Sequence, residues 1–351
     1  MTHKLAFIGF GVVGQGLAQI LRDKKEILEK QEGFAAEIVA ISDFMKGSIY
    51  DPKGLDIDII MRVLNETGNL ENYPKTSGLV TGWDSFRTIR DTNADTIVEV
   101  SYTDVNTGQP AIDHCKLAFE SGKNVVMTNK GPVALAYDDL SKLAMQKNVY
   151  WGFEGTVMSG TPALRMPIAT LAGNEITEIS GILNGTTNYI LTRMENEGIT
   201  YDEALKEAQR LGYAEADPTS DVEGYDARYK IVILSNYVMN APLKVEMVSC
   251  KGIKDITLED IEQAKSEGKR WKLLAKAYKE NDKVIATVSP EKIDITHPLA
   301  SITGATNAIS YQCDLLGTIT LSGAGAGKVE TGFSLLIDLI NINRERKLVN
   351  F

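Results

Sequence analysis

The 351-residue sequence is poor in the residues that bind transition metals or form disulfides. It holds three cysteines and three histidines, all scattered, with no CxxC pair and no zinc-like spacing. We therefore expect no transition-metal site, and we expect free thiols of the kind found in a reducing cytoplasm. Cys115, Cys250 and Cys313 also lie outside any motif that would supply the basic partner of a reactive thiolate.

Long apolar runs and an excess of positive charge are absent as well. No apolar segment approaches the roughly 20 residues that span a bilayer, so we expect no membrane partner. The first predicted strand begins at Lys4, which leaves no room before it for a signal peptide. The formal net charge is -10, so nucleic-acid phosphates would be repelled. These features indicate a cytoplasmic protein long enough for two domains.

A glycine fingerprint follows the first predicted strand. The sequence GFGVVG comes directly after residues 4–8 and opens an amphipathic helix that runs to about residue 30. Strand, glycines and helix in this order are typical of dinucleotide binding. The first glycine makes the tight turn, the second lets the backbone approach a pyrophosphate at the helix N-terminus, and the third allows close helix packing. The expected cofactor contacts in this loop are Gly9, Gly11, Val12, Val13 and Gly14.

An acid closes the second predicted strand. Residues 37–41 read as this strand, and an acid at its end, Asp43, would bind the ribose hydroxyls and favour NAD. Asp43 lies later, however, than the usual spacing of about 20 residues after the glycines. Lys46 is close by and would instead meet a 2′-phosphate, so NAD and NADP both stay open. Residues 44–80 are interpreted as an insertion that carries a short helix at about 57–64.

Two further predicted strands end in polar residues. Residues 95–100 lead to Ser101, and residues 124–127 lead to a polar tip that contains Lys130. Ligands bind at the carboxyl ends of the strands in open α/β sheets. We therefore expect a Rossmann-type doubly wound parallel sheet with Ser101 facing the cofactor and Lys130 at a ligand-binding edge. A solvated loop lysine is the alternative for Lys130.

One polar stretch, GYAEADPTSDVEGYDARYK at residues 212–230, gathers five acids. A helix is predicted to begin near Glu223, which places Asp226 and Lys230 four residues apart on one helix face. An apolar run, IVIL, follows Lys230 at once, so the lysine would stand at the mouth of a core. An ordinary ion pair on a solvated helix face is the alternative. The acids are Glu215, Asp217, Asp221, Glu223 and Asp226.

The segments GILNGTTNYIL and LGYAEADPTSDVEGYDARYK resemble the substrate domain of homoserine dehydrogenase, and the likeness extends over nearly the whole chain. That family interconverts aspartate 4-semialdehyde and L-homoserine with NAD or NADP, in the biosynthesis of threonine, methionine and isoleucine. The resemblance implies a homodimeric short form without a regulatory domain. It also implies an amino-acid substrate held by side chains of both segments.

The resemblance assigns roles to individual residues. Lysine can donate the proton to an aldehyde oxygen, and a second ammonium nearby would lower its pKa. The catalytic residues would be Lys230, Lys130 and Asp226, and Lys130 would touch the cofactor too. The substrate would be bound by Glu215, Asp221, Asn184, Gly185 and Thr186, with the α-carboxylate on the backbone amides of the last three. Gly325 and Gly327 would lie beside the cofactor.

In the family, the segment that leaves the nucleotide domain wraps a monovalent cation, usually sodium. A carboxylate and backbone carbonyls supply the oxygen ligands that a hard cation prefers. The dipeptide Met158-Ser159 departs from the more glycine-rich family pattern. A linker in which Glu154 caps the next helix is the alternative. The implied ligands are Glu154, Val157, Ser159 and Thr161.

Residues 188–197 are predicted to form a helix, and Thr200 has the capping-box spacing that opens another. Residues 273–278 and 284–288 are predicted to pair as a hairpin whose turn includes Asp282. We expect two domains from these patterns. Residues 1–150 would bind the dinucleotide, and a final helix at 327–343 would return to them. Residues 151–326 would form an α+β domain for substrate binding and dimerisation, because the strand-rich region 270–320 has little covering helix and would bury its open face across a two-fold axis.

Two other functions stay open from the sequence. One is a related NAD(P)-dependent reductase of another small oxo acid. The other is a non-catalytic dinucleotide sensor, which would have no need of Lys130 and Lys230 as proton donors. An acylating semialdehyde dehydrogenase is excluded because no cysteine lies on a suitable motif.

Overall fold

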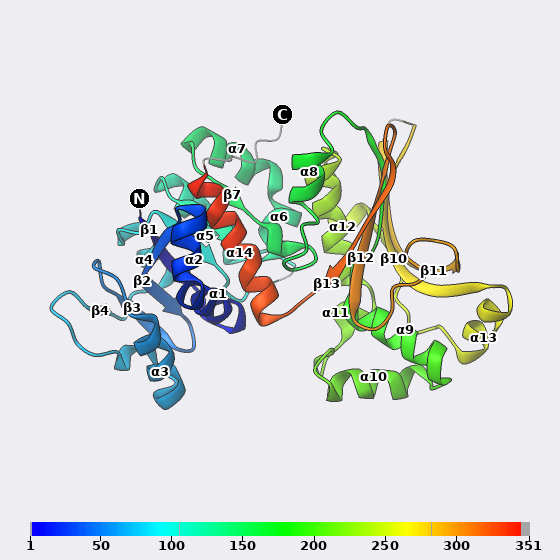
Figure 1. Ribbon diagram of the computed structural model, residues 1–351, viewed down its shortest axis with the longest axis horizontal. Helices are drawn as coiled ribbons and strands as arrows, with labels where there is room; N and C mark the ends of the chain where they lie inside the picture. Colours follow the sequence, from blue (N-terminus) through cyan, green and yellow to red (C-terminus); the bar gives the residue numbers. More distant parts are fainter. Residues whose placement is uncertain (1, 105, 282, 345–351) are drawn as a thin grey trace. The chain divides into compact units, whose positions relative to one another are not determined.

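The computed structural model describes residues 2–104, 106–281 and 283–344 (Figure 1). Contacts between residues divide the chain into two compact units. Among the described residues, the first unit contains those up to Gly160 together with 327–344, and the second is Thr161–Ala326. Helix α14 (Lys328–Asn343) therefore belongs to the first unit although it follows the second in sequence.

The first unit is built on a seven-stranded sheet in the order β4-β3-β2-β1-β5-β6-β7. Strands β2, β1, β5, β6 and β7 run parallel to one another, whereas β3 and β4 add an antiparallel edge beside β2. The doubly wound parallel sheet predicted from the sequence is thus confirmed. The strands are β1 (Thr2–Ile8), β2 (Ala35–Asp43), β3 (Gly47–Tyr50), β4 (Val80–Thr81), β5 (Thr96–Glu99), β6 (Asn124–Met127) and β7 (Trp151–Gly152).

Helices connect these strands in the manner of βαβ units. The first predicted helix is in fact two, because the chain breaks at Lys24. The polar tip after β6 is not a loop, since a helix begins at Lys130 itself. The helices are α1 (Val12–Asp23), α2 (Lys25–Glu32), α3 (Ile57–Thr67), α4 (Ser85–Asp91), α5 (Ala111–Glu120), α6 (Lys130–Leu135) and α7 (Tyr137–Lys147), with short 3₁₀ turns at Leu70–Asn72 and Glu154–Thr156.

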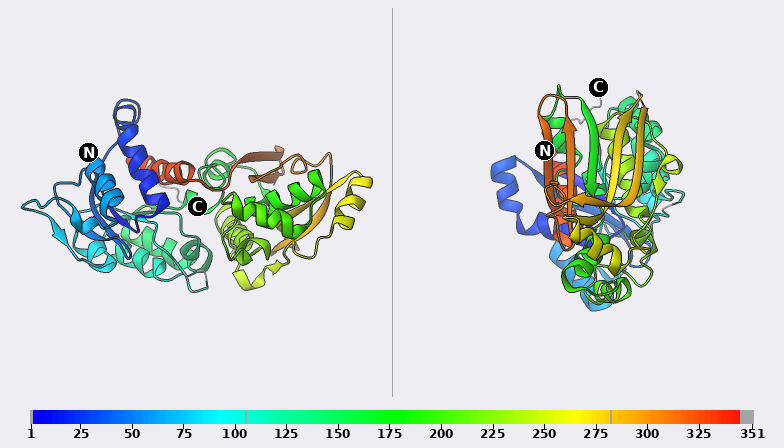
Figure 2. Two further views of the ribbon diagram at one scale, coloured as in Figure 1. Left: turned by 90° about the horizontal axis from the view of Figure 1, so that it is seen from below. Right: turned by 90° about the vertical axis from the view of Figure 1, so that its right-hand side faces the viewer.

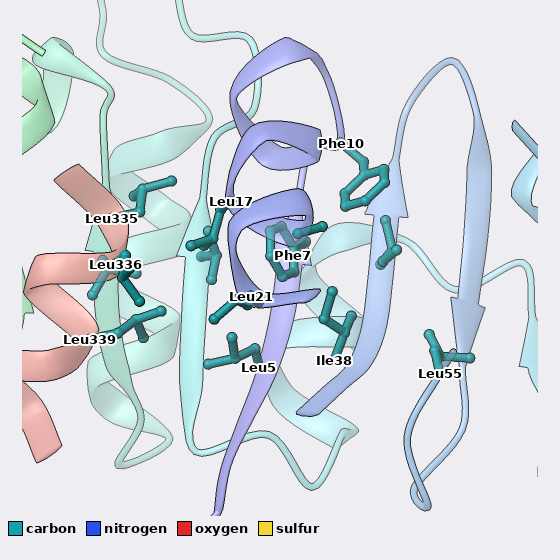
Figure 3. Packing of buried hydrophobic residues seen from close by; sticks show 14 of the residues in the cluster. Leu5, Phe7, Phe10, Leu17, Leu21, Ile38, Leu55, Leu335, Leu336 and Leu339 are labelled. Carbon is teal, nitrogen blue, oxygen red and sulfur yellow. The ribbon is translucent and has the colours of Figure 1, made fainter. Parts of the chain in front are cut away.

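Apolar side chains of β1, α1 and α14 form the core of the first unit (Figure 3). Phe7 and Leu17 are fully buried, and Leu335 of the last helix joins them. Two glycines permit this approach: a Cβ placed on Gly16 would lie 2.2 Å from the carbonyl oxygen of Lys328, and one placed on Gly332 would lie 2.8 Å from the backbone of Gly16. Each such leucine stabilises the fold by about 1.5–3 kcal/mol through burial. This packing explains why α14 belongs to the first unit.

The second unit contains a six-stranded sheet in the order β13-β12-β8-β10-β11-β9. The hairpin predicted around residues 273–288 is present and longer, because its pairing runs from Lys269 with Asp294 to Glu280 with Lys283. Its predicted turn includes Asp282, which lies outside the described residues. The strands are β8 (Ile176–Ile182), β9 (Ser249–Cys250), β10 (Lys269–Glu280), β11 (Lys283–Asp294), β12 (Thr306–Cys313) and β13 (Gly317–Ala324).

Helices α9 and α12 pack against this sheet (Figure 2). Capping boxes open two of the helices, at Thr200 as predicted and also at Thr257. In the described part of the chain, no helix is long and apolar enough to cross a bilayer. The helices are α8 (Arg165–Thr170), α9 (Gly185–Glu197), α10 (Tyr201–Arg210), α11 (Thr219–Val222), α12 (Tyr225–Val238) and α13 (Leu258–Ser266), with a 3₁₀ turn at Val245–Met247.

Candidate active site

Asn184 joins β8 to α9 and connects several polar groups. As N-cap of α9, its Oδ1 accepts a hydrogen bond of 2.9 Å from the backbone N–H of Thr187. Its Nδ2 donates to Asp221 Oδ1 at 2.7 Å and to Asp226 Oδ2 at 3.0 Å. One amide therefore fixes the start of a helix and orients two carboxylates. The helix begins at Gly185, earlier than the position near Asn188 expected from the sequence.

Lys230 lies on α12 and is only 7% exposed. Its Nζ donates to Asp226 Oδ2 at 2.7 Å and to the carbonyl oxygen of Leu183 at 2.6 Å. The next helix residues, Ile231–Leu234, are fully buried. The predicted pair four residues apart is thus present and lies inside the fold rather than on a solvated face. An ammonium has three N–H donors, so one is left for another acceptor.

Asp221 gives this cluster an excess of negative charge. Burial raises the pKa of the Asp221 carboxyl, and the nearby Asp226 carboxylate raises it further. Hydrogen bonds from Asn184 and Thr186 and the charge of Lys230 oppose that rise but do not cancel it. Two carboxylates therefore share one lysine. The arrangement suits an additional cation, such as the ammonium group of an amino acid.

The loop before α11 stands apart from this cluster. Glu215 is exposed, and its backbone carbonyl accepts a hydrogen bond from Gln209 at 3.1 Å. Within the described residues, no hydrogen bond joins the Glu215 carboxylate to Asn184 or Lys230. Tyr213 is 46% exposed and packs at 4.9 Å against Tyr189. Its backbone carbonyl accepts a bond of 2.6 Å from Thr186 Oγ1, which ties the loop to the start of α9.

In the first unit, the fingerprint glycines have the space that a dinucleotide requires. Gly9 has a φ of +86°, and a Cβ there would lie 2.6 Å from the carbonyl oxygen of Val100. Gly11 is the N-cap of α1, and no atom lies within 4 Å of the place a Cβ would take. Val12 is 65% exposed, Val13 is half-buried, and Gly14 packs closely on the Gly9 turn. The N-terminus of α1 therefore presents free backbone N–H groups to an anion.

Asp43 closes β2 and holds the fingerprint loop. Its Oδ2 accepts a hydrogen bond of 2.7 Å from the backbone N–H of Phe10, and the Lys46 ammonium lies 3.5 Å away. Burial acts to raise the pKa of Asp43, but the N–H donors of Phe10, Met45 and Lys46 together with the lysine charge lower it overall. The carboxylate is thus ionised beside the loop that would carry the cofactor.

The ends of β5 and β6 are joined by a residue that the sequence reading missed. Glu99 is fully buried and accepts hydrogen bonds from Ser101 Oγ and Asn129 Nδ2, and His114 Nδ1 lies 3.1 Å from it. Asn129 is the N-cap of α6, and it also donates to the Ser101 carbonyl at 3.0 Å. Half-buried Lys130 follows directly. The sequence did carry a signal for Glu99, because a carboxylate at the end of an apolar strand is unusual enough to indicate a functional residue.

The segment expected to hold a cation is buried. Glu154 is 2% exposed, Val157 is fully buried and Ser159 is 3% exposed. Met158 and Ser159 have φ of 57° and 54°, which turns the chain sharply, and Ser159 Oγ lies 2.8 Å from Thr331 Oγ1. Glu154 is not a helix cap, since it begins a 3₁₀ turn capped by Phe153.

Thr161, the fourth expected cation ligand, belongs to the second unit. No three His, Cys, Asp or Glu side chains gather as a metal centre in the part of the chain that the structure describes. A buried carboxylate beside a sharply turned backbone fits a hard monovalent cation bound largely by carbonyl oxygens.

All three cysteines are free thiols. Burial raises the pKa of the Cys115 thiol well above its usual value, and Glu99 adds to this rise. Burial also raises the pKa of Cys250 and of Cys313. A thiol in this state is a poor nucleophile at neutral pH, which agrees with the exclusion of cysteine chemistry.

The predicted site residues therefore fall into two groups. Asn184, Asp221, Asp226 and Lys230 meet in the second unit. The glycine loop, Asp43, Ser101 and Lys130 belong to the first unit. Gly325 and Gly327 lie on either side of the boundary, at the end of the second unit and the return to the first.

Comparisons with known proteins show the family of the chain. The family model of homoserine dehydrogenase matches residues 162–340, and the model of glutamate, leucine, phenylalanine and valine dehydrogenases matches residues 2–105. The NAD(+)-dependent homoserine dehydrogenase of Pseudomonas canavaninivorans is 45% identical over 343 residues, which are 97% of this chain and 96% of that protein. The chain belongs to the homoserine dehydrogenase family. Its activity is the NAD(P)-dependent interconversion of L-homoserine and aspartate 4-semialdehyde, an oxidation or reduction at a CH–OH carbon.

Solved structures of homoserine dehydrogenases share the fold. A crystal structure of an Archaeoglobus fulgidus protein assigned to this family has a TM-score of 0.86 and 37% identity, covering 97% of this chain and 99% of that one. A hyperthermophilic archaeal homoserine dehydrogenase mutant in complex with NADPH has a TM-score of 0.84 and 30% identity, covering 100% of both chains.

Proposed function

We propose that Lys230 donates the proton to the aldehyde oxygen when aspartate 4-semialdehyde is reduced. One observation carries this assignment: the Lys230 ammonium is buried and held at 2.7 Å by Asp226 and at 2.6 Å by the Leu183 carbonyl. Both acceptors fix its position and leave one N–H for the substrate. A bound nicotinamide would supply the hydride to the carbonyl carbon. The oxygen then takes the lysine proton and becomes the hydroxyl of homoserine, and solvent returns a proton to Lys230.

The other end of the substrate carries an ammonium and a carboxylate. We assign the ammonium to Asp221 and Asp226, whose two negative charges face one lysine. Glu215, exposed on its loop, would supply a further carboxylate. We assign the α-carboxylate to the start of α9, where Gly185 and Thr186 follow the Asn184 cap, because a helix N-terminus attracts anions.

The first unit would hold the cofactor. The pyrophosphate would rest on the Gly11 end of α1, beside Val12 and Val13, where the space above the glycine is open. The Glu99 carboxylate orients Ser101 and Asn129, and through them the start of α6 with Lys130. Lys130 would then contact both cofactor and substrate. A cofactor domain at residues 1–150 and a substrate domain at 151–326 belong to this same proposal.

We further propose that NAD is preferred to NADP. The lowered pKa of Asp43 keeps its carboxylate charged at the end of β2, where it would repel a 2′-phosphate and accept ribose hydroxyls. The Pseudomonas relative is NAD(+)-dependent, whereas the archaeal structure holds NADPH. Lys46 is paired with Asp43 at 3.5 Å, which weakens its attraction for a phosphate. A kcat/KM with NADP above that with NAD would refute this preference.

A monovalent cation would be bound by Glu154 and by the carbonyls of Val157, Ser159 and Thr161. The sharply turned backbone at Met158 and Ser159 supports this, because carbonyl oxygens are ligands that a hard cation prefers. Replacing sodium by tetramethylammonium should then lower thermal stability in the wild type. Unchanged melting in the two salts would count against a bound ion.

We propose a homodimer formed through the six-stranded sheet. Side chains of β8, β12 and β13 line a polar hollow on the sheet, including Ser180, Ser310 and Thr318. Ser180 Oγ is buried without a hydrogen-bond partner in the described part of the chain, as expected of a face whose partner is missing. A second copy related by a two-fold axis would cover this face.

We place the enzyme in the cytoplasm, in the biosynthesis of threonine, methionine and isoleucine. Free thiols at Cys115, Cys250 and Cys313 support a reducing compartment. The net charge of -10 would repel the phosphates of a nucleic acid.

A substrate panel tests the proposed function. Purified protein should reduce aspartate 4-semialdehyde with NADH and oxidise L-homoserine with NAD, both followed by the near-ultraviolet absorbance of the reduced cofactor. Small oxo acids that lack the amino group should be poor substrates, because Asp221 and Asp226 would face no ammonium. Equal turnover of an oxo acid without an amino group would favour the related reductase instead.

A further inference from the structure

Asn307 is a buried amide that the proposed chemistry has not used. It lies at the start of β12 and is fully buried, yet neither Nδ2 nor Oδ1 has a hydrogen-bond partner in the described part of the chain. Buried side-chain amides nearly always find partners, since a group left unsatisfied costs the desolvation that burial imposes. Violations of this rule are expected at functional sites.

The position of Asn307 in the sheet places it beside the catalytic cluster. Its neighbour Ala308 pairs with Ile182 at the end of β8. The chain continues from Ile182 to Leu183, whose carbonyl accepts from Lys230, and to the Asn184 cap. Asn307 therefore stands at the same end of the sheet as the proton donor.

Two glycines enclose the Asn307 amide. A Cβ placed on Gly185, the first residue of α9, would lie 3.3 Å from Oδ1. A Cβ placed on Gly325 would lie 2.4 Å from Cγ, Nδ2 and Oδ1 alike, so the flat amide rests directly on the backbone of Gly325. The amide thus lies between the N-terminus of a 13-residue helix and a glycine-rich segment, 323–327.

We propose that Asn307 is a substrate-binding residue whose Nδ2 donates a hydrogen bond to the α-carboxylate of homoserine at the N-terminus of α9. The first-turn N–H groups of the helix favour an anion there. Rotation of the Asn307 amide about its Cβ–Cγ bond exchanges Oδ1 for Nδ2 beside Gly185, which adds a side-chain donor to them. Because Gly325 covers the amide in the free protein, the backbone around Gly325 shifts when substrate enters. This inference rests on the proposed function and adds a contact that the motif residues do not provide.

The test uses Asn307→Leu, which keeps the shape of the side chain and removes both polar atoms. If the amide is unsatisfied in the free protein, the variant should melt at a higher temperature than the wild type. If the amide binds the carboxylate, KM for L-homoserine should rise about 10- to 100-fold, as expected for a lost hydrogen bond to a charged group. KM for NAD should stay within about two-fold, because the contact is with the substrate.

Asn188→Leu is the matched control for stability. Asn188 is a buried amide on α9 whose Nδ2 donates to the Thr306 carbonyl at 3.1 Å and whose Oδ1 accepts from Lys272 at 3.0 Å. Its replacement should lower the melting temperature, because it leaves those two partners unsatisfied. If the melting temperature rises in Asn307→Leu and falls in Asn188→Leu, the Asn307 amide is unpaired in the free enzyme.

Asn307→Asp tests the identity of the bound group. A carboxylate at this position should repel the α-carboxylate, so KM for homoserine should rise more than in Asn307→Leu. A fall in KM would show that the substrate ammonium binds there, and it would overturn the assignment. The shift in melting temperature caused by homoserine together with NAD gives a second measure of binding that does not depend on turnover.

The outcomes separate this inference from the proposed function. A wild type that turns over no homoserine would defeat the proposed function itself. If the wild type is active and Asn307→Leu has the same kinetic constants, only the proposed role of Asn307 is refuted. A lowered melting temperature in Asn307→Leu would show that the amide is already satisfied in the free enzyme, and it would overturn the inference at its first step. A raised melting temperature with a raised homoserine KM is the result we expect.

Discussion

Asp221 shows how one residue can be costly for stability and useful for binding. Its carboxyl is buried next to Asp226, and these two features raise its pKa above the usual value of 3.8. Between that value and the raised one, the folded state binds more protons than the unfolded state. The contribution of Asp221 to the free energy of unfolding therefore falls as the pH rises through the pKa that its carboxyl has in the folded state.

We expect Asp221→Asn to separate the two effects. The amide can keep accepting the bond from Asn184, so the variant should be as stable as the wild type or more so at neutral pH. KM for homoserine should rise about 10- to 100-fold, because a charge-assisted contact with the ammonium is lost. KM for NAD should be unchanged. Melting curves and steady-state kinetics on the same preparation check this, and an unaltered homoserine KM would contradict the ammonium assignment.

Lys272 on β10 is a second buried charge, only 1% exposed. Its Nζ donates to Asn188 Oδ1 at 3.0 Å and to the Ile302 carbonyl, and burial lowers its pKa from 10.5 to about 8. Between about pH 8 and 10.5 the unfolded state therefore binds more protons than the folded state. Stability from this group rises with pH across that window, and the cost of burying the charge is fully present below it.

We expect Lys272→Met to flatten the pH dependence of stability. The free energy of unfolding, measured with urea between pH 8 and 10, should rise less steeply with pH in the variant than in the wild type. The difference in slope should not exceed about 1.4 kcal/mol per pH unit, which is the limit for one titrating group. Lys123, whose pKa burial also lowers to about 8, keeps its own contribution in both proteins. Identical slopes would mean that Lys272 titrates normally in the folded state.

At the residue scale the sequence could predict local relations and little else. Asp226 and Lys230 are four residues apart on one helix, so helical periodicity alone places them together. Asn184 reaches Asp226 across 42 residues of sequence, and no local pattern encodes that contact. The Glu99 carboxylate was missed for the same reason, because its partner Asn129 is 30 residues away.

Among the elements, α9 matters most because its N-cap orients two acids and its start is our proposed site for the substrate carboxylate. We expect Asn184→Ala to cost about 0.5–2 kcal/mol of stability through loss of the cap. It should also lower kcat/KM for homoserine, because Asp221 and Asp226 lose their common donor. Urea unfolding and steady-state kinetics measure the two effects.

Thr257→Ala is the matched control for this element. Thr257 caps α13 in an exposed capping box of the same unit. The two variants should lose similar stability, but only Asn184→Ala should lose activity. Equal activity in both would show that Asn184 is a helix cap and nothing more.

The elements that the sequence predicted well are those with strong local signals. The first strand, the glycine turn and the capping box at Thr200 belong to this class. The edge strands β3 and β4 escaped notice because Val80–Thr81 is two residues long and pairs only with a distant strand. The helix start at Lys130 was obscured by the glycine and proline that follow it, although proline is favoured in the first turn of a helix.

At the scale of the whole molecule, the open face of the six-stranded sheet predicts a dimer. Ser310→Arg should give a monomer of unchanged secondary structure, because a long charged side chain would lie where the second copy is proposed to pack. Ser266→Arg on exposed α13 is the control and should stay dimeric. Light scattering at micromolar concentration measures both, and a monomeric wild type would refute the dimer.

The central claim is that Lys230 supplies the proton, and single-variant kinetics test it most directly. Lys230→Met keeps the length of the side chain and removes its N–H groups, so kcat with aspartate 4-semialdehyde should fall about 10²- to 10⁴-fold while KM for NADH changes little. Lys254→Met, at an exposed ion pair with Glu223 in the same unit, is the matched control and should keep wild-type turnover. Melting curves of both variants exclude unfolding as the cause. A kcat for Lys230→Met within a few-fold of the wild type would contradict the claim.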